Sequence, residues 1–184
     1  MRYSTSHKAQ TRENLLKSSG AIAKQGGFAV TGVDGLMKAI GLTGGAFYSH
    51  FPSKNDLFSA IVERELSHSL HLLSDADGGS RDKLQRCLDL YLDMAHVQQP
   101  GSGCALPTLG AEIARADLSV REQAEHWLVQ LQQAWAEVLE SPTLAWAIIS
   151  QCVGALLVAR MLASPERQQE VLGSSRALLA TVVP

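Results

Sequence analysis

The segment 43–54 concentrates side-chain groups that bind phosphate. It places hydroxyl, imidazole and ammonium groups in close succession, at Thr43, Tyr48, Ser49, His50 and Lys54. Such groups donate hydrogen bonds to phosphate oxygens or neutralise their charge, and they hold a protein on a nucleic-acid backbone without reading its sequence. The segment is therefore suited to contact phosphates, and the alternative is that His50 is a surface or core-edge histidine and Lys54 a solvated lysine.

Cys104 is the side chain whose surroundings most favour nucleophilic or redox chemistry. It lies in the glycine-rich turn 100–107, where the sequence predicts the N-terminus of a helix. Free N–H groups at such a terminus stabilise a thiolate, and an accessible thiol of lowered pKa suits a sensor of oxidants or electrophiles. A free cysteine is more often a small buried residue, so that alternative stays open. Cys87 and Cys152 lie on apolar helical faces and are interpreted as structural.

Residue patterns typical of enzymes and metal sites are missing from the sequence. We find no nucleophile–base pair and no set of Cys or His residues with metal-ligand spacing. Asp89 and Asp93 lie four residues apart on a helical face, but like-charged pairs of this kind usually face solvent. The sequence therefore predicts no catalytic site, no cofactor and no metal.

Charge is distributed unevenly along the 184 residues, although the net charge is only -2. Residues 1–64 carry eight Lys or Arg against four acids, whereas the remainder carries eight basic and fourteen acidic side chains. A basic head on an acidic body indicates that the head alone meets an anionic partner.

Apolar residues recur at helical spacing through the chain, and no segment shows the alternation of a half-buried strand. Val33, Leu36, Met37 and Ile40 form one such stripe. The pattern predicts an all-α fold with about nine helices, near 8–25, 32–39, 43–50, 53–73, 81–97, 104–116, 118–140, 143–163 and 165–182.

Residues 31–51 predict a helix-turn-helix. Gly41 falls where a tight turn needs positive φ, and a short helix follows. Phe47 and Phe51 are four residues apart on that helix, so both can face the core and leave Gly44 and Gly45 on the other side. Without side chains there, the backbone and the positive end of the helix dipole can approach DNA closely.

Two S/T-x-x-D patterns predict helix starts. Thr31 with Asp34 resembles a capping box before the second helix, and Ser53 with Asp56 repeats it before the fourth. Thr43 is expected to cap the short helix between them.

The run GLTGGAFYSHFPSKNDLF, with Thr31-x-x-Asp34 before it, resembles the signature of the TetR family of one-component repressors. That signature reads G-[VL]-[ST]-x-G-x-[LF]-Y-x-[HY]-F-x-[ST]-K-x-x-L, and the resemblance covers residues 8–66. It implies that Thr43, Gly45 and Tyr48 lie at the DNA groove. It also implies phosphate contacts from Tyr48 and His50, a backbone clamp by Lys54 and a contact from Thr31.

The sequence departs from the family pattern at Gly44, where many members carry lysine or another polar residue. Few side chains then remain to read bases. Thr43 and Ala46 can touch a thymine methyl group, and Ser49 can form a hydrogen bond. Sequence preference is therefore expected to rest partly on DNA shape.

The resemblance and the helix pattern together divide the chain. Residues 1–52 are predicted to form the DNA-binding domain, with the helix 53–73 connecting it to an effector-binding and dimerisation domain at 74–184. The helices near 143–163 and 165–182 are expected to pair with their copies in a homodimer. The apolar run 144–162 is interrupted by Ser150, Gln151 and Arg160, so we interpret it as a buried helix rather than a membrane span.

An effector cavity among the middle helices is a further implication of the resemblance. Its expected lining is aromatic and apolar with a few polar groups: Tyr91, Met94, His96, Trp127 and Trp135. An apolar residue at helical spacing is more often an ordinary core residue, so that alternative stays open for each of them.

The combined hypothesis is a cytoplasmic regulator that binds a double-stranded DNA operator as a homodimer. A small molecule, or modification of Cys104, is expected to release it. The start of the chain has no apolar run typical of a secretory signal, and three scattered cysteines fit a reducing compartment. The alternative is a helical thiol-redox or electrophile-reactive protein without DNA regulation, although it lacks a C-x-x-C pair.

Overall fold

The computed structural model describes residues 5–74 and 81–183. The described residues form ten helices, which confirms the all-α prediction. Their bounds are α1 Thr5–Gly26, α2 Val33–Ala39, α3 Gly44–Phe47, α4 Lys54–Ser74, α5 Arg81–Tyr91, α6 Met94–Gln98, α7 Leu106–Ala114, α8 Leu118–Leu139, α9 Pro142–Met161 and α10 Pro165–Val182.

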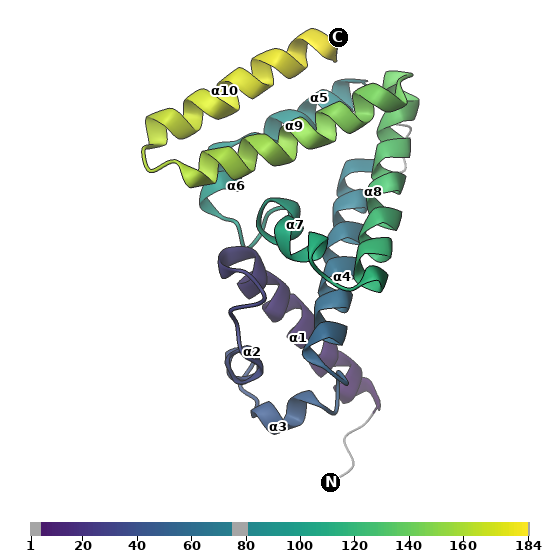
Figure 1. The fold of residues 1–184 in the computed structure, drawn as a ribbon, viewed down its shortest axis with the longest axis vertical. Coiled ribbons are helices and arrows are strands. Elements are labelled where there is room, and N and C mark those ends of the chain that lie inside the picture. Colours follow the sequence, from purple (N-terminus) through teal and green to yellow (C-terminus); the bar gives the residue numbers. More distant parts are fainter. Residues whose placement is uncertain (1–4, 75–80, 184) are drawn as a thin grey trace.

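Helices α1, α2 and α3 form one end of an elongated molecule, and α9 and α10 lie across the other end (Figure 1). Helix α4 runs away from α3 alongside α8, and α8 packs against α9. The short helix α7 contacts α1, α8 and α9, so it lies between the two ends. This placement brings the Cys104 region next to the last turns of α1.

The predicted helix 81–97 is interrupted, which gives ten helices rather than about nine. Asp93 adopts an extended backbone, and its side chain accepts a hydrogen bond from the N–H of Ala95, so it caps a new helix, α6. The apolar pattern of the sequence continues across this break because Leu92, which lies at the break, is itself a buried core residue. The predicted helix 104–116 begins later, at Leu106. The predicted loop 74–80 lies, apart from its first residue, outside the described residues.

The head does not have a core of its own. Its buried cluster is centred on Phe47, Leu57 and Ile61, and it continues into Leu109 of α7 and Val120 of α8. A second cluster joins α5, α8, α9 and α10. Displacement of α7 would therefore disturb the packing of the DNA-binding helices directly, because α7 contributes to their core.

The helix starts follow the predicted caps only in part. Ser53 caps α4 as expected, with the Asp56 N–H donating to Ser53 Oγ at 3.1 Å, but the Asp56 carboxylate accepts from the Ser53 hydroxyl at 2.6 Å rather than from its backbone N–H. The Thr31 prediction is wrong, since Gly32 is the N-cap of α2 and the Thr31 hydroxyl donates instead to the Gly27 carbonyl. Gly41 has φ of +74°, as the turn required.

Helix α9 is long and apolar, with a mean hydropathy of 1.7. Its length and composition alone would allow it to cross a membrane. It packs, however, against α8 on one side and α10 on the other, as a core helix does. Several apolar side chains at its surface remain exposed, among them Trp146, Leu157 and Met161.

Candidate nucleic-acid interface and sensing turn

Helix α3 is anchored by two aromatic residues and presents a bare outer face. Phe47 and Phe51 are buried, with ring centroids 6.0 Å apart. Tyr48 is 68% exposed and touches Phe47 only edge-on. The α-helix is shorter than predicted and ends at Phe47, and residues 48–50 continue as a hydrogen-bonded turn. The exposed residues of this segment are thus presented by a short element clamped from beneath.

Gly44 is explained by a neighbour on α2. A Cβ at position 44 would coincide with Oδ1 of Asp34, whereas a Cβ at Gly45 would meet nothing within 4 Å. Gly44 therefore lets α2 and α3 approach closely, in addition to the role predicted for it at the DNA. Thr43 is the N-cap residue of α3 but makes no side-chain cap bond.

His50 lies among cations that the sequence motifs did not reveal. Burial, and then the positive charges of Lys8 and Arg12, lower the pKa of His50 below its usual 6.5. Arg12 also lies over the Phe51 ring, 4.7 Å from its centroid. Lys8 and Arg12 are one helical turn apart on α1, and this spacing was the signal that could have found them. The geometry brings the start of α1 to the same surface as His50, and we call Thr43–His50 with Lys8 and Arg12 the recognition surface.

Lys54 binds the protein itself in this structure. Its Nζ donates to the Ala29 carbonyl at 2.9 Å and lies 4.8 Å from the centroid of the Phe28 ring. The predicted phosphate clamp is therefore positioned by the turn between α1 and α2, close to Thr31. A phosphate contact from Lys54 requires it to leave the carbonyl or to share its ammonium protons.

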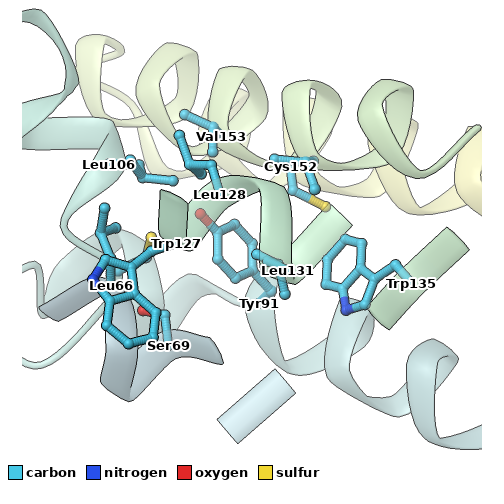
Figure 2. A pocket seen from close by; sticks show the side chains of 12 residues that line it. Leu66, Ser69, Tyr91, Leu106, Trp127, Leu128, Leu131, Trp135, Cys152 and Val153 are labelled. Atoms are coloured by element: carbon cyan, nitrogen blue, oxygen red, sulfur yellow. The ribbon is translucent and has the colours of Figure 1, made fainter. Parts of the chain in front are cut away.

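A cavity among the middle helices is lined by most of the predicted effector residues. Figure 2 shows Tyr91 between Trp127 and Trp135, with α9 above them. Cys104 and Cys152 also line the cavity. Met94 and His96 do not: Met94 packs against the second core cluster, and His96 binds the Cys104 N–H. The free volume is only about 30 Å³, room for a water molecule or two.

Cys104 is not the accessible thiolate that the sequence predicted. Burial raises the pKa of its thiol, and this outweighs the smaller effects of the nearby Tyr91 hydroxyl and Leu106 N–H, which favour the thiolate. Leu106 is the first residue of α7, so the predicted helix-terminus effect exists but is the smaller one. The thiol is protonated at neutral pH.

The turn that carries Cys104 (residues 99–105, the Cys104 turn) is held by His96. The Cys104 N–H donates to His96 Nε2 at 2.8 Å, so Nε2 is unprotonated and Nδ1–H donates to the Tyr91 carbonyl. Burial lowers the pKa of His96, which keeps the ring neutral. A Cβ at Gly103 would collide with this ring, which explains that glycine.

A chain of hydrogen bonds links the Cys104 turn to the head. Lys24 of α1 donates to the Gly103 carbonyl at 3.1 Å and pairs with Glu65 of α4 at 2.6 Å in a buried ion pair. The Thr108 hydroxyl donates to the Lys24 carbonyl, and Arg160 of α9 reaches both Thr108 and the His96 carbonyl. Removing one partner of a buried pair such as Lys24–Glu65 is costly, so this pair holds Lys24 in place beside the Gly103 carbonyl.

A second link is made by Glu112 on α7. Its two carboxylate oxygens accept from the N–H groups of Phe28 and Ala29, at 2.9 and 2.8 Å. These groups lie directly after α1, where Lys54 holds the Ala29 carbonyl. Neither Glu112 nor His96 has a local pattern that reveals its role, because their partners are distant in the sequence.

The architecture is that of a DNA-binding transcriptional regulator, with a three-helix head and a larger helical body. The family model for bacterial regulatory proteins of the tetR family matches residues 15–61. Residues 15–61 therefore match the N-terminal domain of the TetR family of helix-turn-helix transcriptional regulators, a family of regulators and not of enzymes.

Two curated relatives illustrate the range of the family. The chain is 27% identical over 139 residues to the nucleoid occlusion factor SlmA of Marinobacter nauticus, covering 74% of this chain and 70% of that protein. It is 31% identical over 113 residues to the HTH-type transcriptional repressor NemR of Escherichia coli K12, covering 59% of this chain and 56% of NemR.

Solved structures share the whole fold. The reduced form of E. coli NemR superimposes with a TM-score of 0.79 at 24% identity, covering 94% of this chain and 96% of that one. A TetR regulator from Legionella pneumophila gives a TM-score of 0.79 at 22% identity and covers both chains completely. These likenesses establish the fold.

Proposed function

We propose that this regulator is a homodimeric repressor that binds its operator through the recognition surface and leaves it when the Cys104 turn is disturbed. The observation that carries the proposal is the hydrogen bond from Lys24 to the Gly103 carbonyl, which joins the DNA-binding head to the turn beside the effector cavity. A thiol-redox protein without DNA regulation is set aside, because residues 15–61 match a DNA-binding family.

The DNA contacts follow from exposure and charge. Tyr48, Ser49 and Thr43 are exposed on one side of α3, and Gly45 leaves the backbone open there. Neutral His50 donates a hydrogen bond, while Lys8 and Arg12 supply charge to phosphates. Gly44, Thr31 and Lys54 complete the proposed interface at the α1–α2 turn and the N-terminus of α3.

Dimerisation is supported by the exposed apolar side chains of the last two helices. Trp146, Leu157, Val158 and Met161 of α9 and Leu178 of α10 are all more than 40% exposed. A Cβ added at Gly154 or Gly173 would meet nothing within 4 Å, which leaves space for a second helix to approach. Large apolar side chains left exposed on neighbouring helices favour a protein interface. Leu157→Glu is expected to yield monomers in analytical ultracentrifugation.

Release is proposed to begin at the cavity and the Cys104 turn. Adduct formation on Cys104 adds volume where only about 30 Å³ is free, so the turn must move. Movement of Gly103 then breaks the bond to Lys24, and movement of α7 withdraws Glu112 from Phe28 and Ala29. The distance between the two DNA-binding heads of the dimer then changes, and it no longer matches the spacing of the two operator half-sites. The relative NemR is a transcriptional repressor with a solved reduced form, which supports this direction of control.

The test is DNA binding by fluorescence anisotropy, on fragments from upstream of the protein's own gene, with and without N-ethylmaleimide or hydrogen peroxide. Wild type is expected to bind in reductant and to be released by one of these reagents. Cys104→Ser should bind equally well and resist release, while the matched control Cys87→Ser should behave as wild type. Equal release of Cys104→Ser and wild type would exclude the cysteine route.

Binding to no fragment, or binding that does not weaken with salt, would exclude the operator function. The proposed site of action is the cytoplasm, as for soluble regulators of the family.

A further inference from the structure

The interior cavity is too small to be the resting binding site for a ligand. Ligand pockets usually have volumes of about 300–1,000 Å³, whereas this cavity has about 30 Å³ free. Two larger hollows lie on the outer side of the same region. One, of about 500 Å³, lies between α1, α4 and the Cys104 turn. The other, of about 320 Å³, extends from there to Tyr91 and Cys104.

The two hollows adjoin along Lys24, Glu65, His68 and Ser102, which line both, and we call the two hollows together the groove. We propose that this groove binds a small amphipathic carboxylate, with an acidic head at its α1 end and an apolar body against Leu90 and Cys104. The site differs from the interior cavity, although Tyr91 and Cys104 form part of the wall of both.

The α1 end of the groove is cationic. Lys17, Lys24 and Arg64 face it, together with His68 and His71. Glu65 is its one carboxylate among the described residues, and both oxygens of Glu65 are already engaged, by Lys24 at 2.6 Å and by Arg64 at 3.0 Å. Lys17 is exposed and has no ion pair within the part of the chain that the structure describes. An incoming carboxylate therefore meets a cation that it does not have to share.

The other end of the groove is apolar. Leu90 lines it and is 76% exposed, although neighbouring apolar residues of α5 such as Leu84 and Leu88 are buried. Cys87, Tyr91 and Cys104 complete this wall. Covering Leu90 with the body of a ligand removes apolar surface from water, which is worth about 25 cal/mol per Å². Only a molecule with an anionic and an apolar part satisfies both ends.

The groove also touches Lys24 and Gly103, the two residues whose hydrogen bond joins the Cys104 turn to α1. Its walls come from α1 and α4 of the head, from α5 and from the Cys104 turn. A ligand lying across Lys24 and Gly103 would compete with, or reinforce, the bond between them. This regulatory consequence rests on the proposed function, whereas binding itself does not.

The experiment is isothermal titration calorimetry of the full-length, DNA-free protein with octanoate, and with octanol and octylamine as probes of equal length. Octanoate is expected to bind and the other two to bind at least about tenfold more weakly, since they lack the negative charge. Lys17→Glu should weaken octanoate by about tenfold, because it replaces an attraction with a repulsion. The matched control Lys38→Glu, on the exposed side of α2, should leave octanoate binding unchanged.

Leu90→Gln provides the second arm and does not threaten folding, because the side chain is exposed. It should weaken octanoate by about tenfold through lost apolar contact. Equal affinity for octanoate and octanol, no binding of octanoate, or insensitivity to both substitutions would overturn the site. A protein that binds octanoate as expected but no DNA would keep the site and refute the proposed function instead.

Discussion

The recognition surface and the Cys104 turn are both polar, glycine-rich segments, but they are held in opposite ways. The recognition surface rests on two buried aromatic rings from its own short stretch of chain, and its polar groups remain exposed. The Cys104 turn is held by groups from α1, α6 and α9, and its thiol is buried. The recognition surface therefore has polar groups free to bind DNA. A displacement of the Cys104 turn, in contrast, breaks contacts to other helices.

The basic residues of α1 and α4 also fall into two groups, one at the recognition surface and one at the groove. Lys8 and Arg12 lie beside His50, whereas Lys17, Lys24 and Arg64 face the groove next to the Cys104 turn. Helix α1 rises about 1.5 Å per residue, so Lys8 and Lys24 lie about 24 Å apart along it, whereas Arg12 and Lys17 are separated by only about 7.5 Å. The number of basic residues in residues 1–64 therefore overstates the number expected to contact DNA.

The largest difference is expected between Phe47 and its neighbour Tyr48. Phe47→Ala removes a fully buried ring beneath α3 and should destabilise the protein by about 3–5 kcal/mol. Tyr48→Ala should change stability by less than about 1 kcal/mol but weaken operator binding. Urea denaturation followed by circular dichroism measures the first effect, and anisotropy measures the second. Similar losses of stability for the two variants would show that α3 is not anchored as described.

His96→Leu tests how the Cys104 turn is held. It leaves the Cys104 N–H without its acceptor and the Tyr91 carbonyl without its donor. Each unsatisfied buried group costs about 1–3 kcal/mol. The matched control His126→Leu, on the exposed face of α8, should cost much less in the same urea titration.

His96 also makes stability depend on pH with a defined sign. Its folded-state pKa is lowered, so the unfolded chain takes up protons first as the pH falls. The stabilisation from neutral His96 is full above its unfolded value of 6.5 and is lost as the pH falls from there through the lowered folded-state pKa. His50 contributes with the same sign. Unfolding free energies measured over the range in which histidine titrates should therefore fall less steeply for His96→Leu, and an unchanged slope would contradict the neutral, buried ring.

Salt dependence separates the two groups of cations on α1. Arg12→Gln should reduce the slope of log K against log salt by about 1, as expected for one lost phosphate contact. Lys17→Gln carries the same loss of charge but faces the groove, so its slope should match that of wild type. Equal reductions in both variants would mean that DNA contacts both groups.

The smallest effect concerns Gly44 and Asp34. A Cβ at position 44 meets the Asp34 carboxylate, so Gly44→Ala should be tolerated better after Asp34→Ala. We expect a coupling free energy of about 0.5–1 kcal/mol in a double-mutant cycle measured by urea denaturation. The control cycle between Asp34 and Gly45 should show none, because a Cβ at position 45 meets no neighbour. Coupling of equal size in both cycles would argue against the contact.

By itself, the sequence determined the fold class, the family resemblance and the helix-turn-helix, because these depend on interactions a few residues apart. The positive φ of Gly41, the buried Phe47 and Phe51 and the Ser53 cap all follow from local spacing. The break at Asp93 was missed because the apolar pattern continues through Leu92 while only a local cap ends the helix.

Only the tertiary structure decided the pKa of the Cys104 thiol and the groups with which the basic side chains of α1 interact. The start of α7 acts on the thiol as local reasoning predicted, yet burial by Tyr91 and the surrounding helices outweighs it and raises the pKa. Lys24 reaches Glu65 and Gly103, forty-one and seventy-nine residues away in the chain. Desolvation and long-range pairing depend on which distant segments meet, and no spacing within a single helix encodes that.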